Sequence, residues 1–176
     1  MKARLSAKSA GANRLPQKQN EIKFVADSML GNVARKLRIF GFDTLYLAHV
    51  EDSEVLKIGV DQDRVILTAD KEFFKRIVKA KAKGVLVGGS DELEDLVHIL
   101  EKNGIRSIDR TESRCSTCNG RLVEVSRNDV EESLPEKIAS NHSLFFRCAS
   151  CGKIYWEGSH AKRISLLAEN LKSRLR

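Results

Sequence analysis

The four cysteines constrain the fold of this chain more than any other feature of its sequence. They form two Cys-x-x-Cys pairs, "CSTC" and "CASC", with 29 residues between the pairs. Each pair runs into turn-forming residues, "CNG" and "CGK", which let backbone amides turn towards the sulfurs. Two such pairs can set four thiolates tetrahedrally around one zinc ion. The expected zinc ligands are Cys115, Cys118, Cys148 and Cys151.

Two disulfides or a redox Cys-x-x-Cys are the alternatives to zinc. The chain begins "MKARLSAKSAGANRLPQKQ", which lacks the apolar core of a secretory signal, and no apolar run approaches the roughly 20 residues of a membrane span. We therefore favour zinc and expect a cytoplasmic protein without a membrane partner, although an organellar transit peptide has a similar composition. A closed four-cysteine site staples a small module and leaves no open position for catalysis.

Short β-rich runs alternate with amphipathic segments between about residues 21 and 110. Strands are expected at "IKFVAD", "DTLYLA", "RVILTA" and "GVLVGG". Helices are expected at "SMLGNVARKLRIFG", with Ser28 as N-cap, and at "DSEVLKIGVDQD", "KEFFKRIVKAK" and "DELEDLVHILEKNG". This alternation predicts an α/β fold, an open, mainly parallel sheet with helices on both faces. Shorter β-like runs then follow the linker "TESR".

Positive charge is concentrated at the two ends of the chain. Residues 1–20 contribute +5, residues 21–110 contribute −1 and residues 111–176 contribute +3 to the net charge of +7. A polyanion would be held by the N-terminal arm, which we expect to be disordered, and by the C-terminal third. The near-neutral middle would need metal ions to approach phosphate. The alternative is that the basic composition only serves solubility.

Three aspartates are predicted to meet at the carboxyl edge of the sheet. Asp27 and Asp70 each end a strand, and Asp52 opens the helix that precedes the strand ending near Asp70. Working groups collect at this edge in open α/β sheets. Helix N-capping is the alternative role of Asp27 and Asp70. Carboxylates without His or Cys ligands select Mg²⁺ or Mn²⁺, which suits phosphodiester hydrolysis.

Several motifs together resemble a known nuclease family. They are "FVADSMLGNVARKLRIFGFDTLYL", "DSEVLKIGVDQDRVILTADKEF", the cysteine pairs and "YWEGSH". This set is similar to the RNase domain at the C-terminus of Mut-seven-type exoribonucleases, a PIN-like nuclease fold with an attached zinc ribbon, over roughly Lys23 to Arg163. The resemblance implies a metal-dependent ribonuclease, with Asp27, Asp52 and Asp70 at the acidic positions of the site.

A fourth acid is common in PIN-like sites and is harder to place here. Asp91 follows "VGG" on the same side of the sheet and is the supplementary candidate, with N-capping as its alternative role. Asp43 stands at the amino end of a strand. The candidate substrate contacts are Ser28, Arg35, Arg38, Thr68 and Trp156. Each has a structural alternative: helix capping for Ser28, a solvated helix face for the arginines, a strand position for Thr68 and a core position for Trp156.

The sequence thus predicts a basic arm (1–20), a PIN-like nuclease domain (21–110), a zinc ribbon (111–163) and a helical tail (164–176). The favoured function is endonucleolytic hydrolysis of RNA, and the ribbon is expected to assist RNA binding. Ribonucleoprotein partners are compatible with this function. A non-catalytic RNA-binding adaptor with a vestigial acidic site is the alternative. No P-loop or G-x-G-x-x-G is present, and Met29 stands where a haloacid-type phosphatase requires a second Asp. The pattern fixes no oligomeric state.

Overall fold

The structure, a computed structural model, describes residues 22–88 and 91–175. The predicted basic arm at residues 1–20 lies outside these residues. Among the helices of the described part, none is long and apolar enough to cross a membrane.

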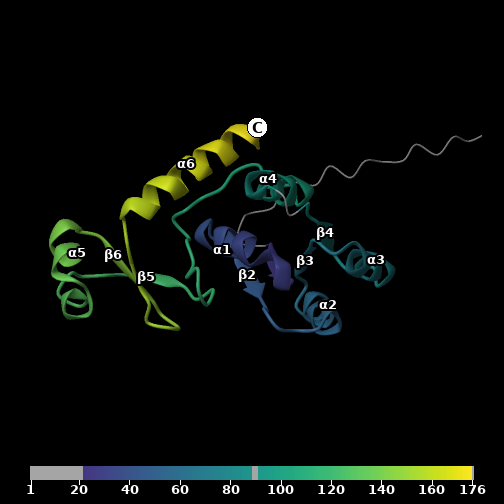
Figure 1. Ribbon diagram of the computed structural model, residues 1–176, viewed down its shortest axis with the longest axis horizontal. Coiled ribbons are helices and arrows are strands. Elements are labelled where there is room, and N and C mark those ends of the chain that lie inside the picture. Colours follow the sequence, from purple (N-terminus) through teal and green to yellow (C-terminus); the bar gives the residue numbers. More distant parts are fainter. Residues whose placement is uncertain (1–21, 89–90, 176) are drawn as a thin grey trace, which may run out of the picture.

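Four parallel strands form the central sheet, in the order β2-β1-β3-β4 (Figure 1). Each strand is followed by a helix, so the right-handed crossovers expected of alternating strands and helices build one open sheet. The strands are β1 (Lys23–Ala26), β2 (Asp43–Tyr46), β3 (Val65–Thr68) and β4 (Gly84–Leu86). The helices are η2 (Ser28–Leu30), α1 (Gly31–Ile39), α2 (Asp52–Asp61), α3 (Lys71–Lys79) and α4 (Glu92–Lys102).

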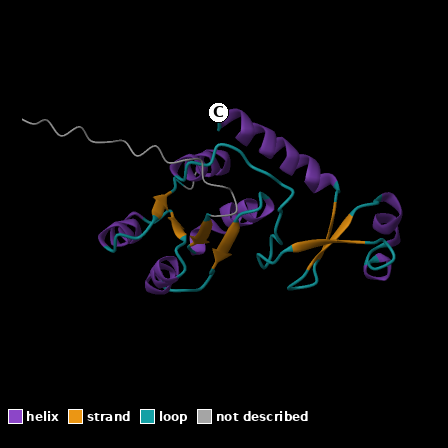
Figure 2. Ribbon diagram, turned by 180° about the vertical axis from the view of Figure 1, so that it is seen from behind, coloured by secondary structure: helices purple, strands orange, loops and turns teal. Residues whose placement is uncertain are grey.

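Helices cover both faces of this sheet, as Figure 2 shows. Phe24 and Leu67 point to one face, where they join a core shared with α1 and α4. Val25 and Ile66, one position further along their strands, point to the other face and pack with side chains of α2 and α3. This alternation follows from the two-residue period of a strand. The predicted α/β fold with a mainly parallel, two-faced sheet is confirmed.

Asp27, and not Ser28, caps the first helical segment. The predicted N-cap at Ser28 is wrong, because Ser28 is already the first residue of η2 and the carboxylate of Asp27 accepts the hydrogen bond from Met29 N. A single 3₁₀ turn then leads into α1 at Gly31. The chain therefore starts its first helix directly at the end of β1 and brings the Asp27 carboxylate into that turn.

A smaller antiparallel sheet follows the linker. Its strands are β5 (Leu122–Val125), β6 (Phe145–Cys148) and β7 (Ile154–Trp156), in that order across the sheet. Two short helical segments, η3 (Glu131–Ser133) and α5 (Glu136–Asn141), lie between β5 and β6 and were not expected from the sequence. We call residues 111–158 the ribbon.

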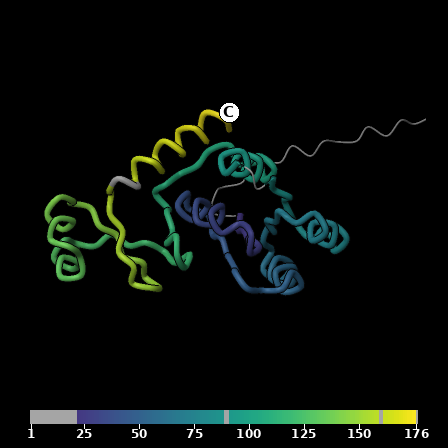
Figure 3. Tube along the Cα trace, in the orientation of Figure 1, coloured from purple at the N-terminus to yellow at the C-terminus, as the bar shows by residue number. Residues whose placement is uncertain are grey.

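The last helix joins the two sheets. α6 (Ser159–Arg174) begins inside the range predicted for the ribbon and packs against α4, so that Ala168 and Leu171 share the core of the parallel sheet. Figure 3 shows the chain returning from the ribbon to the neighbourhood of α4. The C-terminal segment is thus an integral cover of the larger domain, because its apolar side chains bury against α4.

Candidate active site and metal centre

Asp27 is a buried carboxylate at the carboxyl end of β1. Only 6% of its surface is exposed. One oxygen, Oδ1, accepts a hydrogen bond from Met29 N at 2.9 Å, and Oδ2 accepts one from the hydroxyl of Thr68. Its backbone N–H donates to Leu67 O at 3.0 Å, which extends the β1–β3 ladder by one step. Two neutral donors therefore fix the orientation of this carboxylate.

Thr68 connects Asp27 with Asp70. It is fully buried at the end of β3, and its Oγ1 also accepts a hydrogen bond from Asp70 N at 2.9 Å. Asp70 Oδ1 caps α3 by accepting from Glu72 N at 2.6 Å and Phe73 N at 3.0 Å. Asp70 is exposed to solvent. The two acids thus follow neighbouring strands, and the Thr68 hydroxyl links the Asp27 carboxylate to the backbone amide of Asp70. Both acids also act as the helix caps that the alternative interpretation required.

Asp52 lies on the first turn of α2, and its partner is a cation. Its Oδ2 is 3.0 Å from Arg76 Nη1 of α3, and 43% of the Asp52 side chain is exposed. Within residues 22–88 and 91–175, no three Asp, Glu or His residues bring their ligand atoms within 4.8 Å of one another. The structure therefore couples Asp27 to Asp70 through Thr68 and pairs Asp52 with Arg76.

The α4 helix contributes one predicted acid and one that the sequence analysis missed. Asp91 caps α4 by accepting from Leu93 N at 2.8 Å and Glu94 N at 3.2 Å. Asp95, one turn further, is buried with 6% exposed and accepts from Gly88 N at 3.0 Å. The signal for Asp95 was an acid inside the apolar stripe of "ELEDLVHIL", where a charged side chain needs a specific partner.

The amino edge of the sheet holds a different kind of acid. Asp43 Oδ1 is 2.8 Å from Arg64 Nη1 and also accepts from Asn119 Nδ2 at 2.8 Å. Burial alone would raise the pKa of Asp43, but the hydrogen bonds from Arg64 and Asn119 prevail and lower it. Asn119 belongs to the first cysteine turn, and its Oδ1 accepts from Thr44 N at 3.1 Å. This network attaches the ribbon to the strand β2.

The four cysteines form a compact group suited to one metal ion. They are free thiols, so the disulfide alternative is wrong, and their sulfurs all lie within 4.8 Å of one another. The Sγ atoms of Cys115 and Cys151 are 3.7 Å apart, and those of Cys118 and Cys148 are 3.4 Å apart. Four thiolates at 2.3 Å from a tetrahedral zinc would be about 3.8 Å apart. The group therefore fits a metal such as zinc.

Both cysteine turns have the same backbone geometry. Asn119 N donates to Cys115 O, and Gly152 N donates to Cys148 O, each at 2.9 Å. Asn119 and Gly152 have φ of 69° and 72°, in the left-handed region that Asn and Gly tolerate. The turn-forming residues after each pair therefore act as the sequence indicated. A Cβ on Gly120 would lie 2.8 Å from Cys148 Sγ, so this position has no room for a side chain.

One thiol of this group is set up to ionise first. Burial would raise the pKa of Cys115, but hydrogen bonds from Tyr155 Oη and from the amides of Cys118 and Thr117 lower it to about 6. For Cys118, the Gly120 amide acts to lower the pKa, while desolvation and the neighbouring thiols raise it to about 12. Such a difference between the two pKa values is expected where neighbouring thiols share few hydrogen-bond donors. A bound cation would stabilise the thiolates that lack a donor.

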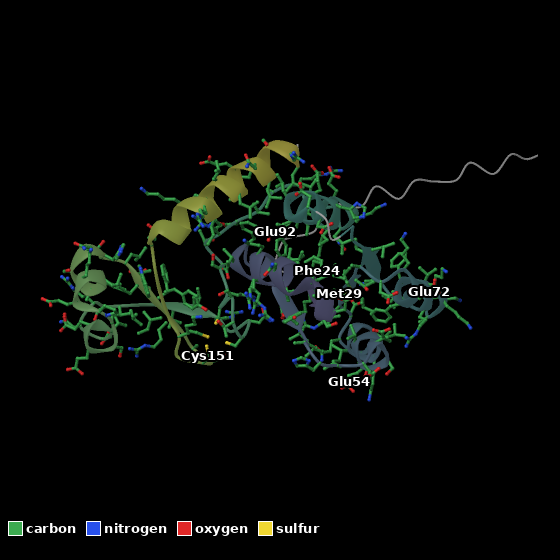
Figure 4. The ribbon with its side chains drawn as sticks, viewed as in Figure 1. Phe24, Met29, Glu54, Glu72, Glu92 and Cys151 are labelled. Atoms are coloured by element: carbon green, nitrogen blue, oxygen red, sulfur yellow. The ribbon has the colours of Figure 1, made fainter. Side chains whose placement is uncertain are left out.

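The predicted substrate contacts divide into buried and accessible residues. Arg38 is buried and donates to Thr44 O, Ser116 O and Thr117 O, so it ties α1 to the first cysteine turn. Arg35 and Ser28 are exposed, and Trp156 is half-buried at the end of β7. Figure 4 labels Met29, which lies two residues after Asp27 and is 71% exposed. It also labels Cys151, at the end of the ribbon nearest the larger domain.

The comparison with protein families covers most of the structure. A family model described as the Mut7-C RNAse domain matches residues 22–167, from the residue before β1 into α6. No curated protein matches the chain. The match includes both edges of the parallel sheet, the four cysteines and most of α6, so the elements described above belong to one family unit.

Proposed function

The chain belongs to the Mut7-C RNase domain family, and from this premise we propose that it is an Mg²⁺- or Mn²⁺-dependent ribonuclease whose centre is the Asp27–Thr68–Asp70 group. The family implies RNA as the substrate. The observation that carries the site is the shared hydroxyl of Thr68, which donates to Asp27 and accepts from Asp70 N. This hydroxyl ties the Asp27 side chain to the backbone of Asp70, at the ends of the adjacent strands β1 and β3.

The chemistry of these two carboxylates suits a hard divalent cation. Each oxygen of Asp27 accepts one hydrogen bond, so each keeps a lone pair, and Asp70 has an oxygen, Oδ2, beyond the one that caps α3. Oxygen ligands without His or Cys are those that Mg²⁺ and Mn²⁺ prefer. When bound, the cation supplies Lewis acidity for phosphodiester hydrolysis. Asp27 and Asp70 would hold it, and Thr68 would orient Asp27.

Asp52 and Asp91 have supporting roles in this proposal. Asp52 would join the site by exchanging Arg76 for the cation, since the ion pair between these two side chains, 43% and 50% exposed, contributes little stability. Asp91 caps α4 through Oδ1 and offers its second oxygen from the neighbouring strand connection. Zinc in the four-cysteine group would be structural, because four thiolates fill its coordination sphere.

We favour an endonucleolytic mode for this site. Asp70 is exposed and Met29 is 71% exposed, so the edge that carries the acids is open to a continuous strand. A site that measures a chain end would need a closed wall next to the acids. An open edge accepts a phosphodiester within a chain and leaves both flanking segments free to continue along the protein.

A cleavage assay on single-stranded and structured RNA tests the proposal. The wild-type chain, with Mg²⁺ or Mn²⁺ added, is compared with Asp27→Asn and Asp70→Asn, which keep the shape of the side chain and remove its charge. We expect each variant to lower the cleavage rate by more than about 100-fold, since loss of even an outer-shell partner of a metal site costs 10–100-fold. A circular RNA substrate reports endonucleolytic cleavage directly, because it has no ends.

The matched control is Asp61→Asn. Asp61 is an exposed acid at the last residue of α2, away from the helix end that carries Asp52. Its replacement changes the net charge by the same amount and should leave cleavage unchanged. Absence of wild-type cleavage, or equal cleavage by all three variants, would refute the proposed site.

The Asp52–Arg76 pair favours the adaptor as a second candidate function, because a cation already neutralises one predicted ligand. In that case the chain binds RNA without cleaving it. RNA binding would then survive Asp27→Asn and Asp70→Asn but would be lost when Cys148 and Cys151 are both replaced by Ser. Metal-dependent cleavage that requires Asp27 would exclude this alternative.

A further inference from the structure

A cavity of about 860 Å³ lies between the larger domain and the ribbon. Its walls come from α1, from the linker after α4, from the ribbon sheet and from α6. Figures 1 and 3 show α6 bridging the two parts above this region. The volume is in the range of pockets that hold small organic ligands, about 300–1,000 Å³. It is therefore large enough for parts of a nucleic-acid strand.

One wall of this cavity leads towards the acidic site. Four residues of α1 line it, Asn32, Arg35, Lys36 and Ile39. They are spaced i, i+3, i+4 and i+7, so they form one face of the helix. The helix starts at Gly31, immediately after the turn that Asp27 caps. The lining face of α1 therefore begins at Asn32, five residues after Asp27 in the chain.

The cavity is strongly positive. Its lining includes five cations and one acid, Glu157. Lys36 is paired with Glu92 at 2.9 Å, but none of the four arginines forms an ion pair within the described part of the chain. These arginines are Arg35, Arg110, Arg114 and Arg163. Four guanidinium groups without an ion pair among the described residues, around one concave surface, favour a ligand with several negative charges.

Arg110 is a cation of this wall whose hydrogen-bonding groups are only partly satisfied. Its Nη1 donates to Ser165 Oγ at 2.9 Å, which holds the side chain between the linker and α6. Its Nε is buried without a hydrogen-bond partner among the described residues. A buried donor without an acceptor is costly, and such groups are rare in folded proteins. A phosphate entering the cavity would offset the charge of this side chain.

Aromatic side chains complete the cavity from the ribbon side. Tyr155 and Trp156 are neighbours at the end of β7, and Phe146 is on the adjacent strand β6. The hydroxyl of Tyr155 lies 3.0 Å from Cys115 Sγ, so this ring is tied to the cysteine group. Trp156 is half-buried and keeps part of its surface accessible. An indole ring is a side chain on which an unpaired base can stack.

We propose that this cavity binds the single-stranded RNA segment that flanks the cleaved phosphodiester, with its phosphates on the arginines and a base on Trp156. Stacking requires unpaired bases, because the bases of a duplex face one another. The α1 face connects the bound segment to Asp27. The identity of the ligand as RNA rests on the proposed function, but the location of the site rests on the cavity, its charge and its aromatic wall.

Intrinsic fluorescence tests the site in the unaltered protein. Trp156 is the chain's single tryptophan, so its emission reports on this cavity alone. We expect a single-stranded oligoribonucleotide, added to the zinc-loaded full chain without Mg²⁺ or Mn²⁺, to quench this emission. The corresponding RNA duplex should quench it much less. Recovery of intact RNA on a gel shows that the signal is binding and not cleavage.

Substitutions locate the strand by fluorescence anisotropy of labelled RNA. Trp156→Leu should weaken binding of the single strand by about 10-fold, within the range of base stacking on an aromatic ring. Arg35→Gln and Arg163→Gln should each weaken it several-fold and lower the slope of log Kd against log salt by about 0.7. Arg127→Gln, an exposed arginine of the ribbon outside the cavity lining, is the matched control.

The outcomes separate this proposal from the proposed function. Unchanged RNA binding in all three cavity variants, together with unquenched Trp156 in the wild type, would overturn the site while cleavage through Asp27 and Asp70 still stands. Loss of binding in these variants, in a protein that never cleaves RNA, would support the cavity and refute the nuclease. Quenching by an acidic peptide but not by RNA would overturn RNA as the ligand. Circular dichroism confirms that each variant is folded.

Discussion

The acids at the two edges of the parallel sheet have different partners. At the amino edge, Asp43 is neutralised by the guanidinium of Arg64 and by Asn119 from the ribbon. At the carboxyl edge, Asp27 accepts hydrogen bonds only from a neutral amide and a neutral hydroxyl, and no ion pair within the described residues includes Asp27 or Asp70. The described residues therefore provide no ion-pair partner for Asp27 or Asp70 at the carboxyl edge.

In this sheet, the edge that attaches the ribbon is not the edge that carries the proposed catalytic acids. The amino edge uses its acid to fasten the ribbon, because Asn119 contacts both Asp43 and the backbone of Thr44. In the function proposed above, a metal ion at the carboxyl edge would not have to displace a cation from Asp27 or Asp70, because neither has an ion-pair partner among the described residues. Asp52 is intermediate, since it lies at the beginning of α2 and is paired with Arg76.

The largest effect is expected at the amino edge. Asp43→Ala leaves Arg64, which is 7% exposed, without its carboxylate, and should lower the free energy of unfolding by about 3 kcal/mol. Urea denaturation of the zinc-loaded protein measures it. Cleavage per folded molecule should be unchanged, because this acid has only a structural role. A large loss of cleavage by a fully folded Asp43→Ala protein would contradict the division between the edges.

Two buried threonines provide a matched pair for the next test. Thr68→Val removes the hydroxyl that orients Asp27 and should lower cleavage by about 10–100-fold. Thr44, equally buried, donates to Phe42 O at the amino edge, and Thr44→Val should cost comparable stability without this loss of cleavage. Cleavage rates and thermal midpoints are measured for both variants. Equal cleavage by the two would mean that Thr68 does not position the site.

Acid should weaken the amino edge in a defined direction. Because the folded-state pKa of Asp43 is lowered, its contribution to stability is present above the unfolded-state pKa, about 3.9, and is lost as the pH falls below it. Asp43→Asn should therefore show a smaller decrease in thermal midpoint than the wild type between pH 5 and about pH 3. The cysteine thiolates titrate in both proteins, so the difference between the two pH profiles reports the contribution of Asp43. Parallel profiles would contradict the assignment.

The smallest effect is expected at Asp52. Arg76→Ala removes the cation that competes for this carboxylate, and should lower the Mn²⁺ concentration for half-maximal cleavage by no more than about 5-fold, since an exposed pair contributes up to about 1 kcal/mol. Lys75→Ala, which breaks the neighbouring pair with Glu72, is the control. A raised Mn²⁺ requirement in Arg76→Ala would indicate that Arg76 itself assists the reaction.

Much of the fold was predictable because its patterns are local. The alternation of β-rich and amphipathic segments indicated four strands, four helices and a parallel sheet, and the structure has these elements in that order. The spacing of the cysteines indicated one four-thiol group, which the structure assembles. The short segments η3 and α5 were missed, since neither carries a long enough periodic pattern to stand out.

The site was predictable only in part. The position of Asp27 and Asp70 at strand ends follows from the sequence, but their connection through Thr68 depends on the β1–β3 pairing. The burial of Arg38 was not predicted, because charged residues on a helix normally face solvent, and the signal for Asp95, its place in an apolar stripe, was missed. Both are buried where backbone groups outside the helix supply hydrogen bonds: Gly88, seven residues away, for Asp95, and Thr44 together with the distant Ser116 for Arg38.

The sequence by itself determined the order of the elements, the four thiols and the placement of acids after strands, because periodicity, turn chemistry and ligand spacing act over a few neighbouring residues. Only the tertiary structure decided which acids keep a free charge. Arg64, just before β3, reaches Asp43 of β2 across the one intervening strand β1, and Arg76 reaches Asp52 from another helix. No cation in the described part of the chain pairs with Asp27 or Asp70. Charge pairing depends on distances between remote segments, and these are set by packing.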